Sequence, residues 1–272
     1  MLQYRDYLTN TLNRNVFHEF VFLFFYMYIQ QKSVTTKTIN SGWIFNFVFS
    51  CLFLLFMAGC KNDLSMVNDV DGNSYHTIKI GTQTWMVENL KTTKFNDGAP
   101  ITLIRDSASW KAALSPGYCF YRNDSAKNKL TYGALYNWYA VNTGKLAPKG
   151  WHIPTDAEWS VLIKYVSSKY NTSCSAAKAL ALNSIWRQDS TGCSVGNDQT
   201  KNNGSGFSAV PGGIRNVSSG SYASLDSNGN WWSSTQVVPG WAWRISLYNN
   251  FGDVGRGNEF IQAGLSVRCI KD

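Results

Sequence analysis

Polar and apolar residues alternate in two neighbouring stretches, residues 75–80 and 83–88, which are linked by Gly81 and Thr82. A period of two is typical of half-buried strands, and a short link that contains glycine is typical of a hairpin. The pattern therefore predicts a β-hairpin near the start of the folded part of the chain. Residues 118–121, which are almost wholly apolar, predict a buried strand.

A helical spacing of apolar residues runs from Trp159 to Val166. Just before it, Thr155 and Glu158 form the Thr-x-x-Glu pattern of a capping box, which satisfies free amides at a helix start. These residues predict a helix that begins after Thr155 and buries one face. Weaker helical patterns cover residues 132–141 and 176–182.

The last third of the chain is rich in Gly, Ser and Asn and carries only short apolar runs. We expect a long loop over 192–206 and strands over 207–210, 231–235, 242–247 and 265–270. Strands at both ends with helices between them, and no strand–helix–strand rhythm, are typical of an α+β domain.

The first sixty residues have a different pattern. An almost uncharged run over 43–59 follows Lys32 and Lys37, ends in Ala58-Gly59 and is followed at once by Cys60. A basic region, an apolar region and small residues before a cut site are typical of a secretory signal, and a Cys after them resembles a bacterial lipobox. The alternative is a transmembrane anchor that ends in an incidental Cys.

This pattern divides the chain into a leader over 1–59, a lipidated tether over 60–69 and one domain over 70–272. We expect Cys60 to be lipidated and to hold the protein in the cell envelope, as an outer-membrane lipoprotein facing the periplasm or the cell surface. A signal starting at Met1 would be unusually long, and Met27 is a candidate for the true start.

The formal net charge of +8 does not indicate nucleic-acid binding, because the basic residues are scattered singly along the folded part. Four cysteines follow Cys60, and an even number in an exported domain favours disulfides. Three pairings are open; we favour Cys174–Cys193 and Cys119–Cys269. Without a Cys-x-x-Cys motif and with three widely spaced histidines, a zinc site is not expected.

Six motifs follow one another in a fixed order: DVDGNSYHTIKIGTQTWMVENLKTTKFNDG, GALYNWYAV, PKGWHIPTDAEWSVL, GSGFSAVPGGIR, WWSST and GLSVRC. Together they resemble the Fibrobacter succinogenes major paralogous domain family over most of residues 70–270. The resemblance implies an exported lipoprotein of Bacteroidetes- or Fibrobacter-like bacteria, in a family whose biochemical function is largely unassigned. Three of the motifs are more distantly similar to the formylglycine-generating enzyme domain, which implies a single irregular C-type lectin-like fold.

The chemistry of those distant relatives does not carry over. The formylglycine-generating enzymes hold copper with two cysteines just before the closing strand, but residues 249–264 contain no Cys. The Glu-Pro-Asn, Gln-Pro-Asp and Trp-Asn-Asp tracts with which C-type lectins bind calcium and sugar are also absent. No catalytic or metal-binding residues are therefore assigned. The one candidate cation is a structural calcium around Asn197 and Asp198.

The leading hypothesis is a non-catalytic surface binding or adhesion module whose ligand is a glycan or an envelope protein. The six motifs would form the scaffold, and the segments 187–205 and 237–262 would form the binding face. Two alternatives stay open: an enzyme of unknown reaction on the same scaffold, and an architectural envelope protein. The candidate ligand-binding residues are Trp241, Tyr248, Arg256 and Glu259, followed by Arg215.

Overall fold

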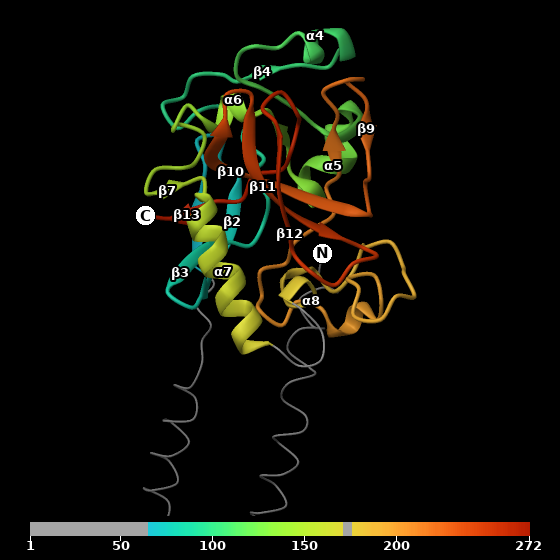
Figure 1. The fold of residues 1–272 in the computed structure, drawn as a ribbon. Helices are drawn as coiled ribbons and strands as arrows, with labels where there is room; N and C mark the ends of the chain where they lie inside the picture. Colours follow the sequence, from blue (N-terminus) through green and yellow to red (C-terminus); the bar gives the residue numbers. More distant parts are fainter. Residues whose placement is uncertain (1–64, 171–175) are drawn as a thin grey trace, which may run out of the picture. The chain divides into compact units, whose positions relative to one another are not determined.

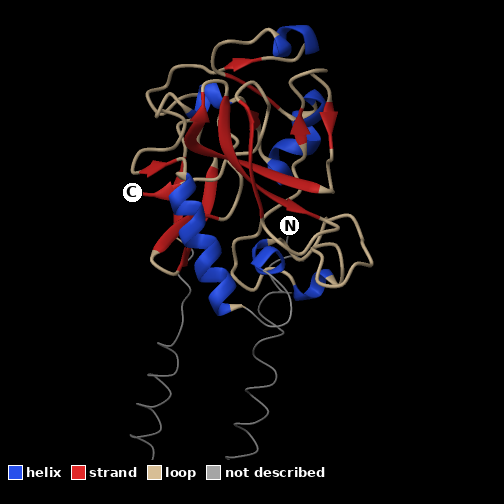
Figure 2. Cartoon of the chain, viewed as in Figure 1, coloured by secondary structure: helices blue, strands red, loops and turns tan. Residues whose placement is uncertain are grey.

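Mostly antiparallel strands and a few short helices make up residues 65–170 and 176–272, the part of the chain that the computed structural model describes (Figures 1 and 2). The strands are β1 (Met66–Asn68), β2 (Ser74–Ile80), β3 (Gln83–Met86), β4 (Thr102–Leu103), β5 (Gly117–Cys119), β6 (Leu135–Tyr136), β7 (Trp151–His152), β8 (Ile214–Arg215), β9 (Tyr222–Ala223), β10 (Asn228–Val238), β11 (Trp241–Tyr248), β12 (Gly255–Phe260) and β13 (Ile270–Lys271). The helices are α4 (Ser107–Lys111), α5 (Ser125–Tyr132), α6 (Trp138–Val141), α7 (Asp156–Lys169) and α8 (Ala176–Leu180), with 3-10 turns η1 (Tyr121–Asn123) and η2 (Gln199–Lys201).

Two sheets organise the domain. One has the strand order β1-β2-β3-β13-β7, so β13, from the end of the sequence, lies between strands from its earlier part. The other is the antiparallel sheet β10-β11-β12. Helix α7 contacts strands of both sheets, β2 of the first and β10 and β11 of the second. Smaller sheets, β4-β5-β6 and β8-β9, complete a mixed domain of many strands and few helices.

The hairpin and the main helix form as the sequence predicts. Strands β2 and β3 pair with Ile80 opposite Gln83 across the short link. At the start of α7, the Thr155 hydroxyl accepts from the Glu158 amide at 3.2 Å, and the Glu158 carboxylate accepts from the Thr155 amide at 2.8 Å. Trp159 on the buried face packs against Trp85, with 4.9 Å between ring centroids. Local pattern and tertiary packing agree here.

The helix predicted over 132–141 forms only in its last four residues, as α6. The segment instead leaves α5, forms β6 and then enters α6. Gly133 has a φ of 75°, and a Cβ there would lie 2.7 Å from the Leu90 carbonyl oxygen, so the chain turns at this glycine. The Asn137 side chain then caps α6 and also accepts from the Gly117 amide at 3.0 Å, which fixes the segment beside β5.

Strand predictions in the last third are partly confirmed. Strands β10 and β11 cover the predicted runs over 231–235 and 242–247. Residues 207–210 form only an isolated bridge, through Ala209. Within 265–270, Leu265 and Ser266 form isolated bridges and only Ile270 belongs to a strand, β13. Strand β12 was not predicted, because its sequence GRGNEF has no apolar alternation and it lies at a sheet edge.

A buried hydrogen-bond cluster, Asn89 with Trp231 and Arg268, joins the family-like motifs; we call it the central knot. The Asn89 carboxamide oxygen accepts from the Trp231 indole at 2.8 Å and from Arg268 Nη2 at 2.9 Å. Arg268 Nη1 donates to the carbonyl oxygens of Phe207, at 2.6 Å, and Met86, at 3.2 Å. Burial lowers the pKa of Arg268 to about 9. These contacts support a scaffold role for the motifs.

The predicted disulfide between Cys119 and Cys269 is not formed: both are free, buried thiols. Cys119 packs in a cluster with Ile104 and Trp110, whereas Cys269 packs in the larger cluster around Tyr136. The two side chains therefore belong to different parts of the core. The other predicted pair involves Cys174, which lies outside the described residues, so that pairing stays a prediction.

The leader, the tether up to residue 64 and the lipidation site Cys60 also lie outside the described residues. Within 65–170 and 176–272, no helix has both the length and the apolar character needed to cross a bilayer.

Candidate functional site

Four of the five candidate ligand-binding residues lie in the sheet β10-β11-β12, but on opposite faces. In an antiparallel pair, residues opposite one another point to the same face and neighbours along a strand point to opposite faces. Trp241 pairs with Phe260, and Ile245 pairs with Arg256, which places all four on one face. Glu259 pairs with Ala242, on the other face.

The first face, which we call the stacking face, consists of Trp241, Trp243, Arg256 and Phe260. The rings of Trp241 and Phe260 lie 3.8 Å apart between centroids, at an interplanar angle of 34°. The Arg256 guanidinium carbon lies 3.7 Å from the centre of the Trp243 ring. Phe260 is 44% exposed, and Trp241 and Trp243 are partly exposed. Aromatic surface of this kind is available to an incoming ligand.

A carboxylate from α7 completes the stacking face. Arg256 donates through Nε to Asp156 Oδ1 at 2.8 Å and through Nη2 to Asp156 Oδ2 at 2.6 Å. The hydrogen bond to Asp156 raises the pKa of Arg256. Asp156 is the first residue of α7, so the helix reaches the sheet at the Arg256 pair. The two-point geometry holds a planar cation flat against the Trp243 ring.

The opposite face, which we call the polar face, is organised by Arg244. Its Nη1 donates to the Ser246 hydroxyl, to the Asn230 carboxamide oxygen at 3.3 Å and to the Tyr248 hydroxyl at 3.4 Å. Its Nε lies 3.6 Å from a Glu259 carboxylate oxygen. Burial raises the pKa of Tyr248, but the hydrogen bonds with Arg244 and Ser246 and the charge of Arg244 together outweigh it, and the net shift is downward. These groups mainly bind one another.

Arg215, the fifth candidate, is not available to a ligand, and this prediction is wrong. Its side chain is fully buried between the rings of Trp110 and Tyr222. The guanidinium donates to four main-chain carbonyl oxygens, those of Ile104, Arg105, Asp106 and Gly220, at 2.5 to 3.1 Å. Arg215 holds distant loops together instead.

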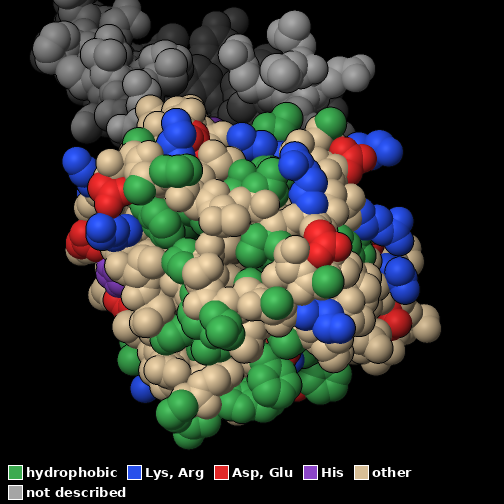
Figure 3. Space-filling view, turned by 90° about the horizontal axis from the view of Figure 1, so that it is seen from above, with side chains coloured by type: hydrophobic (Ala, Val, Ile, Leu, Met, Phe, Trp, Pro, Cys, Tyr) green, Lys and Arg blue, Asp and Glu red, His purple; other side chains and the backbone are tan. Residues whose placement is uncertain are grey.

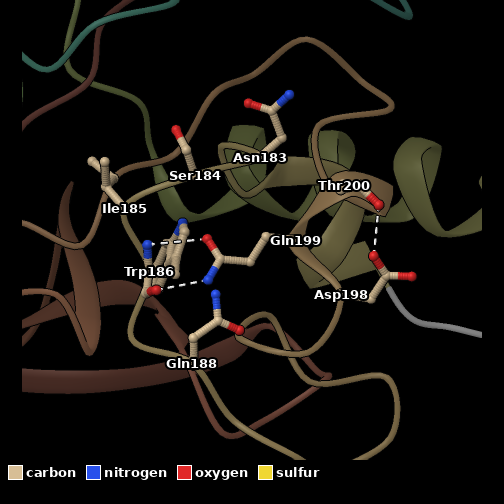
Figure 4. A pocket seen from close by; sticks show the side chains of 8 residues that line it. All are labelled: Asn183, Ser184, Ile185, Trp186, Gln188, Asp198, Gln199 and Thr200. Carbon is tan, nitrogen blue, oxygen red and sulfur yellow. Dashed lines mark hydrogen bonds between the residues drawn. The ribbon is translucent and has the colours of Figure 1, made fainter.

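A shallow hollow of about 500 Å³ lies around η2 and overlaps the first predicted binding segment, 187–205 (Figure 4). The buried Trp186 and the carboxamide of Gln199 form its base: Gln199 accepts from the Trp186 amide at 3.2 Å and donates to the Trp186 carbonyl at 2.7 Å. The residues around it are Asn183, Ser184, Ile185, Gln188, Asp198 and Thr200.

Lys178 holds the loop beside this hollow. Its buried ammonium donates to the carbonyl oxygens of Ser194, at 3.1 Å, Asn197, and Asp198, at 3.4 Å. Burial lowers the pKa of Lys178, while the Asp198 charge opposes this shift. The ammonium therefore sits among carbonyl oxygens of the segment considered for calcium. In the described residues, no group of three or more His, Cys, Asp or Glu is arranged to hold a metal ion.

One further titratable cluster joins α7 to the end of the sequence. His152 lies 2.9 Å from a Glu158 oxygen through Nε2 and 2.7 Å from an Asp272 oxygen through Nδ1. Burial lowers the pKa of His152, but the two hydrogen bonds outweigh it and the net shift is upward. Burial raises the pKa of Glu158, but hydrogen bonds from Thr155 and His152 outweigh it and the net shift is downward.

Sequence reasoning missed Asp156, Trp243 and Phe260 as parts of the stacking face. Asp156 lies in the first turn of α7, and nothing in the sequence around it indicates that Arg256, 100 residues later, lies beside it. Trp243 lies two positions after Trp241 on β11, and residues two apart on a strand point to the same face. This two-residue spacing is visible in the sequence and could have added Trp243 to the candidate residues.

Seen from above the view of Figure 1, one side of the molecule has hydrophobic side chains over much of its middle, with Lys and Arg dispersed mostly towards the periphery (Figure 3). This distribution offers no concentrated basic surface on that side. Among known proteins, the model of the Fibrobacter succinogenes major domain matches residues 78–271 of the chain. No curated protein and no solved structure gives a match.

Proposed function

The chain belongs to the Fibrobacter succinogenes major domain family, and we propose that it is an exported surface module that binds carbohydrate and catalyses no reaction. The observation that carries the proposal is the stacking face. It combines the adjoining rings of Trp241 and Phe260 with the Arg256–Asp156 pair. The rings offer apolar planes and the pair offers charged hydrogen-bonding groups.

This combination fits the chemistry of a sugar ring. A pyranose has flat patches of C–H groups that can lie on an aromatic plane, and hydroxyl groups at its rim that donate and accept hydrogen bonds. Arg256 supplies donors and Asp156 supplies acceptors next to the Trp243 ring. Because both charged groups are already paired, a neutral ligand can contact them without leaving an unpaired charge.

An envelope protein is the weaker candidate for this face. Stable protein interfaces bury roughly 800 Å² on each partner and have an apolar centre within a polar rim. Large exposed hydrophobic side chains are few at the stacking face: Phe260 is 44% exposed, and Val238, which pairs with Trp241 from the end of β10, is 52% exposed. A ligand that contacts one or two rings matches such a small surface better.

An enzyme is less well supported. Catalytic sites bring together ionisable groups that are free to act on a substrate. On the polar face, Arg244 is already bound to Asn230, Ser246 and Tyr248. His76 and His152 each pair with a carboxylate, as a catalytic base can, but neither lines the hollow around η2. The alternative would gain support if turnover were lost in Tyr248→Phe while folding was kept.

We further propose that Cys60 carries a lipid that anchors the domain to the outer membrane, on the periplasmic or the outer side. The family resemblance and the pattern before Cys60 support this part, and two acyl chains would hold the protein stably. Replacing Cys60 by Ser should move the protein from the membrane fraction to the soluble one. Continued lipid labelling of that variant would overturn the assignment. The C-type lectin-like fold is likewise a proposal that rests on the resemblance.

Carbohydrate binding can be tested on a soluble fragment, because residues from Asp63 to Asp272 form a compact unit. Titration calorimetry with a panel of neutral oligosaccharides, including β-1,4-linked hexose tetramers, should find a ligand. Trp241→Ala should weaken its binding about tenfold, or about 1.4 kcal/mol, and leave the thermal unfolding cooperative.

The matched control is Phe251→Ala, which removes a ring that is 53% exposed in the turn after β11. This variant should bind as the unmodified fragment does. Unchanged affinity in Trp241→Ala would remove the stacking face from the proposal. Failure of every sugar, together with saturable binding of a purified envelope protein, would replace carbohydrate by protein as the ligand.

A further inference from the structure

We propose that the hollow around η2 is a second binding site, which takes a single neutral pyranose ring. It is formed by the segment 183–188 on one side and by residues 198–200 on the other (Figure 4). Its volume of about 500 Å³ falls within the range of roughly 300–1,000 Å³ that small-molecule sites occupy. The proposal stands on these residues alone and does not require that the stacking face binds anything.

The base of the hollow is preformed. Gln199 is buried, and its carboxamide uses both ends on the main chain of Trp186, so neither group turns towards solvent. The Trp186 indole is fixed from below by a 3.2 Å hydrogen bond to the Ala209 carbonyl. A ligand would therefore meet a surface that is already ordered, which reduces the entropy lost on binding.

The walls are held in unusual backbone conformations. Ile185 has a φ of 64° and Asp198 a φ of 39°, in the left-handed region that a β-branched residue such as Ile seldom adopts. Lys178 fixes the Asp198 side from within, through three carbonyl oxygens of the segment 194–198. Strain of this kind persists only where the surroundings impose it, so the shape of the hollow is built into the fold.

Polar side chains line the opening, and Asn183 and Gln188 among them are exposed to solvent. Asn183, Ser184 and Gln188 make no side-chain hydrogen bond to any residue in the described part of the chain, whereas the Asp198 carboxylate accepts from Thr200 at 2.6 Å. A carboxamide presents a donor and an acceptor side by side. Two neighbouring hydroxyl groups of a sugar present the same pair in return. The lining thus matches a ring with several hydroxyl groups.

Other ligand classes fit this lining less well. No Lys or Arg lines the hollow, and the nearby Lys201 ammonium is paired with Asp198 at 2.9 Å, so an anion gains little. A divalent cation would find one carboxylate where such ions prefer several oxygen ligands. The lining is mixed: Ile185 is exposed and offers apolar surface next to the polar groups, so a wholly apolar molecule would leave those polar groups without partners. A peptide would find loops and no free strand edge.

Nuclear magnetic resonance can locate binding residue by residue. Isotope-labelled fragment 63–272 would be titrated into the millimolar range with methyl β-glucoside, methyl β-galactoside and N-acetylglucosamine. At least one sugar should shift the side-chain amide signals of Asn183 and Gln188 and the main-chain amide of Trp186 in a saturable manner. The Trp241 indole signal reports the stacking face separately, so failure at either site is recognisable.

Two substitutions test the contacts. Asn183→Ala combined with Gln188→Ala should weaken the binding seen at the Trp186 amide at least fivefold. Asn142→Ala, which removes an exposed carboxamide at the end of α6, should leave it unchanged. Absence of saturable shifts over 183–200 with every sugar would overturn the proposal, as would full affinity in the double variant. Saturable shifts with a peptide and none with sugars would also overturn it.

Discussion

The central knot and the stacking face each place an arginine over an aromatic ring. The Arg268 guanidinium lies 4.4 Å from the centre of the Phe207 ring, and that of Arg256 lies 3.7 Å from the centre of the Trp243 ring. Arg268 is fully buried and donates to a carboxamide and to main-chain carbonyls. The Arg256 side chain is 45% exposed and pairs with a carboxylate. The same contact belongs to the scaffold in one region and to an accessible surface in the other.

The difference shows why a cation beside an aromatic ring does not by itself identify a binding site. What distinguishes a buried arginine from an accessible one is the set of other groups that contact its guanidinium. Main-chain acceptors on several sides consume the donors of Arg268, as they do those of Arg215. Arg256 keeps an edge towards solvent because α7 begins at Asp156 and extends no further over the sheet.

The largest effect on stability should come from Arg268→Met, and the same substitution at Arg256 provides the comparison. Arg268→Met leaves buried acceptors in the central knot without donors, and we expect a loss of about 3–5 kcal/mol in the free energy of unfolding. Arg256→Met removes a partly exposed pair and should lose about 0.5–1 kcal/mol. Chemical unfolding of both variants measures the difference. Equal losses would show that the two regions do not differ as described.

Lys178→Met tests a second buried cation, whose partners are also main-chain oxygens. Three carbonyls would lose their donor, and we expect a loss of about 2–3 kcal/mol, with faster proteolysis in the loop before η2. Lys169→Met, on the exposed end of α7, serves as the control. A chelator should leave the melting temperature of the unmodified fragment unchanged. A drop on chelation would point to bound calcium in this domain.

The smallest effect should appear at the half-exposed cluster of His152, Glu158 and Asp272. The pKa of His152 is raised by folding, so its stabilisation is complete below its unfolded pKa of about 6.5 and is lost as the pH rises through the folded value. Folding lowers the pKa of Glu158. Its contribution to stability is therefore present above its unfolded pKa of about 4.3 and is lost as the pH falls through the folded value.

His152→Gln should therefore cost about 0.5–1 kcal/mol near pH 5.5 and clearly less near pH 8.5, because solvent screens these groups. Unfolding curves at the two pH values measure this. Arg268→Met should show no comparable pH dependence over that range, because the hydrogen-bond partners of Arg268 are a carboxamide and main-chain carbonyls, which do not titrate. A His152→Gln effect that is constant with pH would mean that the contact is not ionic.

Much of the scaffold could be predicted because its signals are local. The capping box of Thr155 and Glu158 set the start of α7, and alternation set the hairpin of β2 and β3. The helix expected over 132–141 failed because Gly133 and Asn137 respond to distant partners, the Leu90 carbonyl and the Gly117 amide. The spacing of apolar residues along the chain carries no information about such long-range contacts.

The candidate site was only partly predictable for the same reason. The sequence places Trp241, Tyr248, Arg256 and Glu259 in one segment, and in the structure all four lie on the strands β11 and β12 within it. It did not show that they divide between two faces, because β12 has no apolar pattern from which its register could be read. Arg215 was misjudged because burial of a charged side chain depends on carbonyls from residues 104–106.

The sequence by itself determined the order of the motifs, the family, the helix start at Thr155 and the location of the aromatic residues. Each of these depends on residues that are close in the chain or on the identity of the residues alone. Only the tertiary structure decided which arginines are buried, which face of the sheet is open and that Asp156 meets Arg256. Those outcomes depend on contacts between residues about 100 positions apart, where packing and desolvation, rather than local propensity, set the free energy.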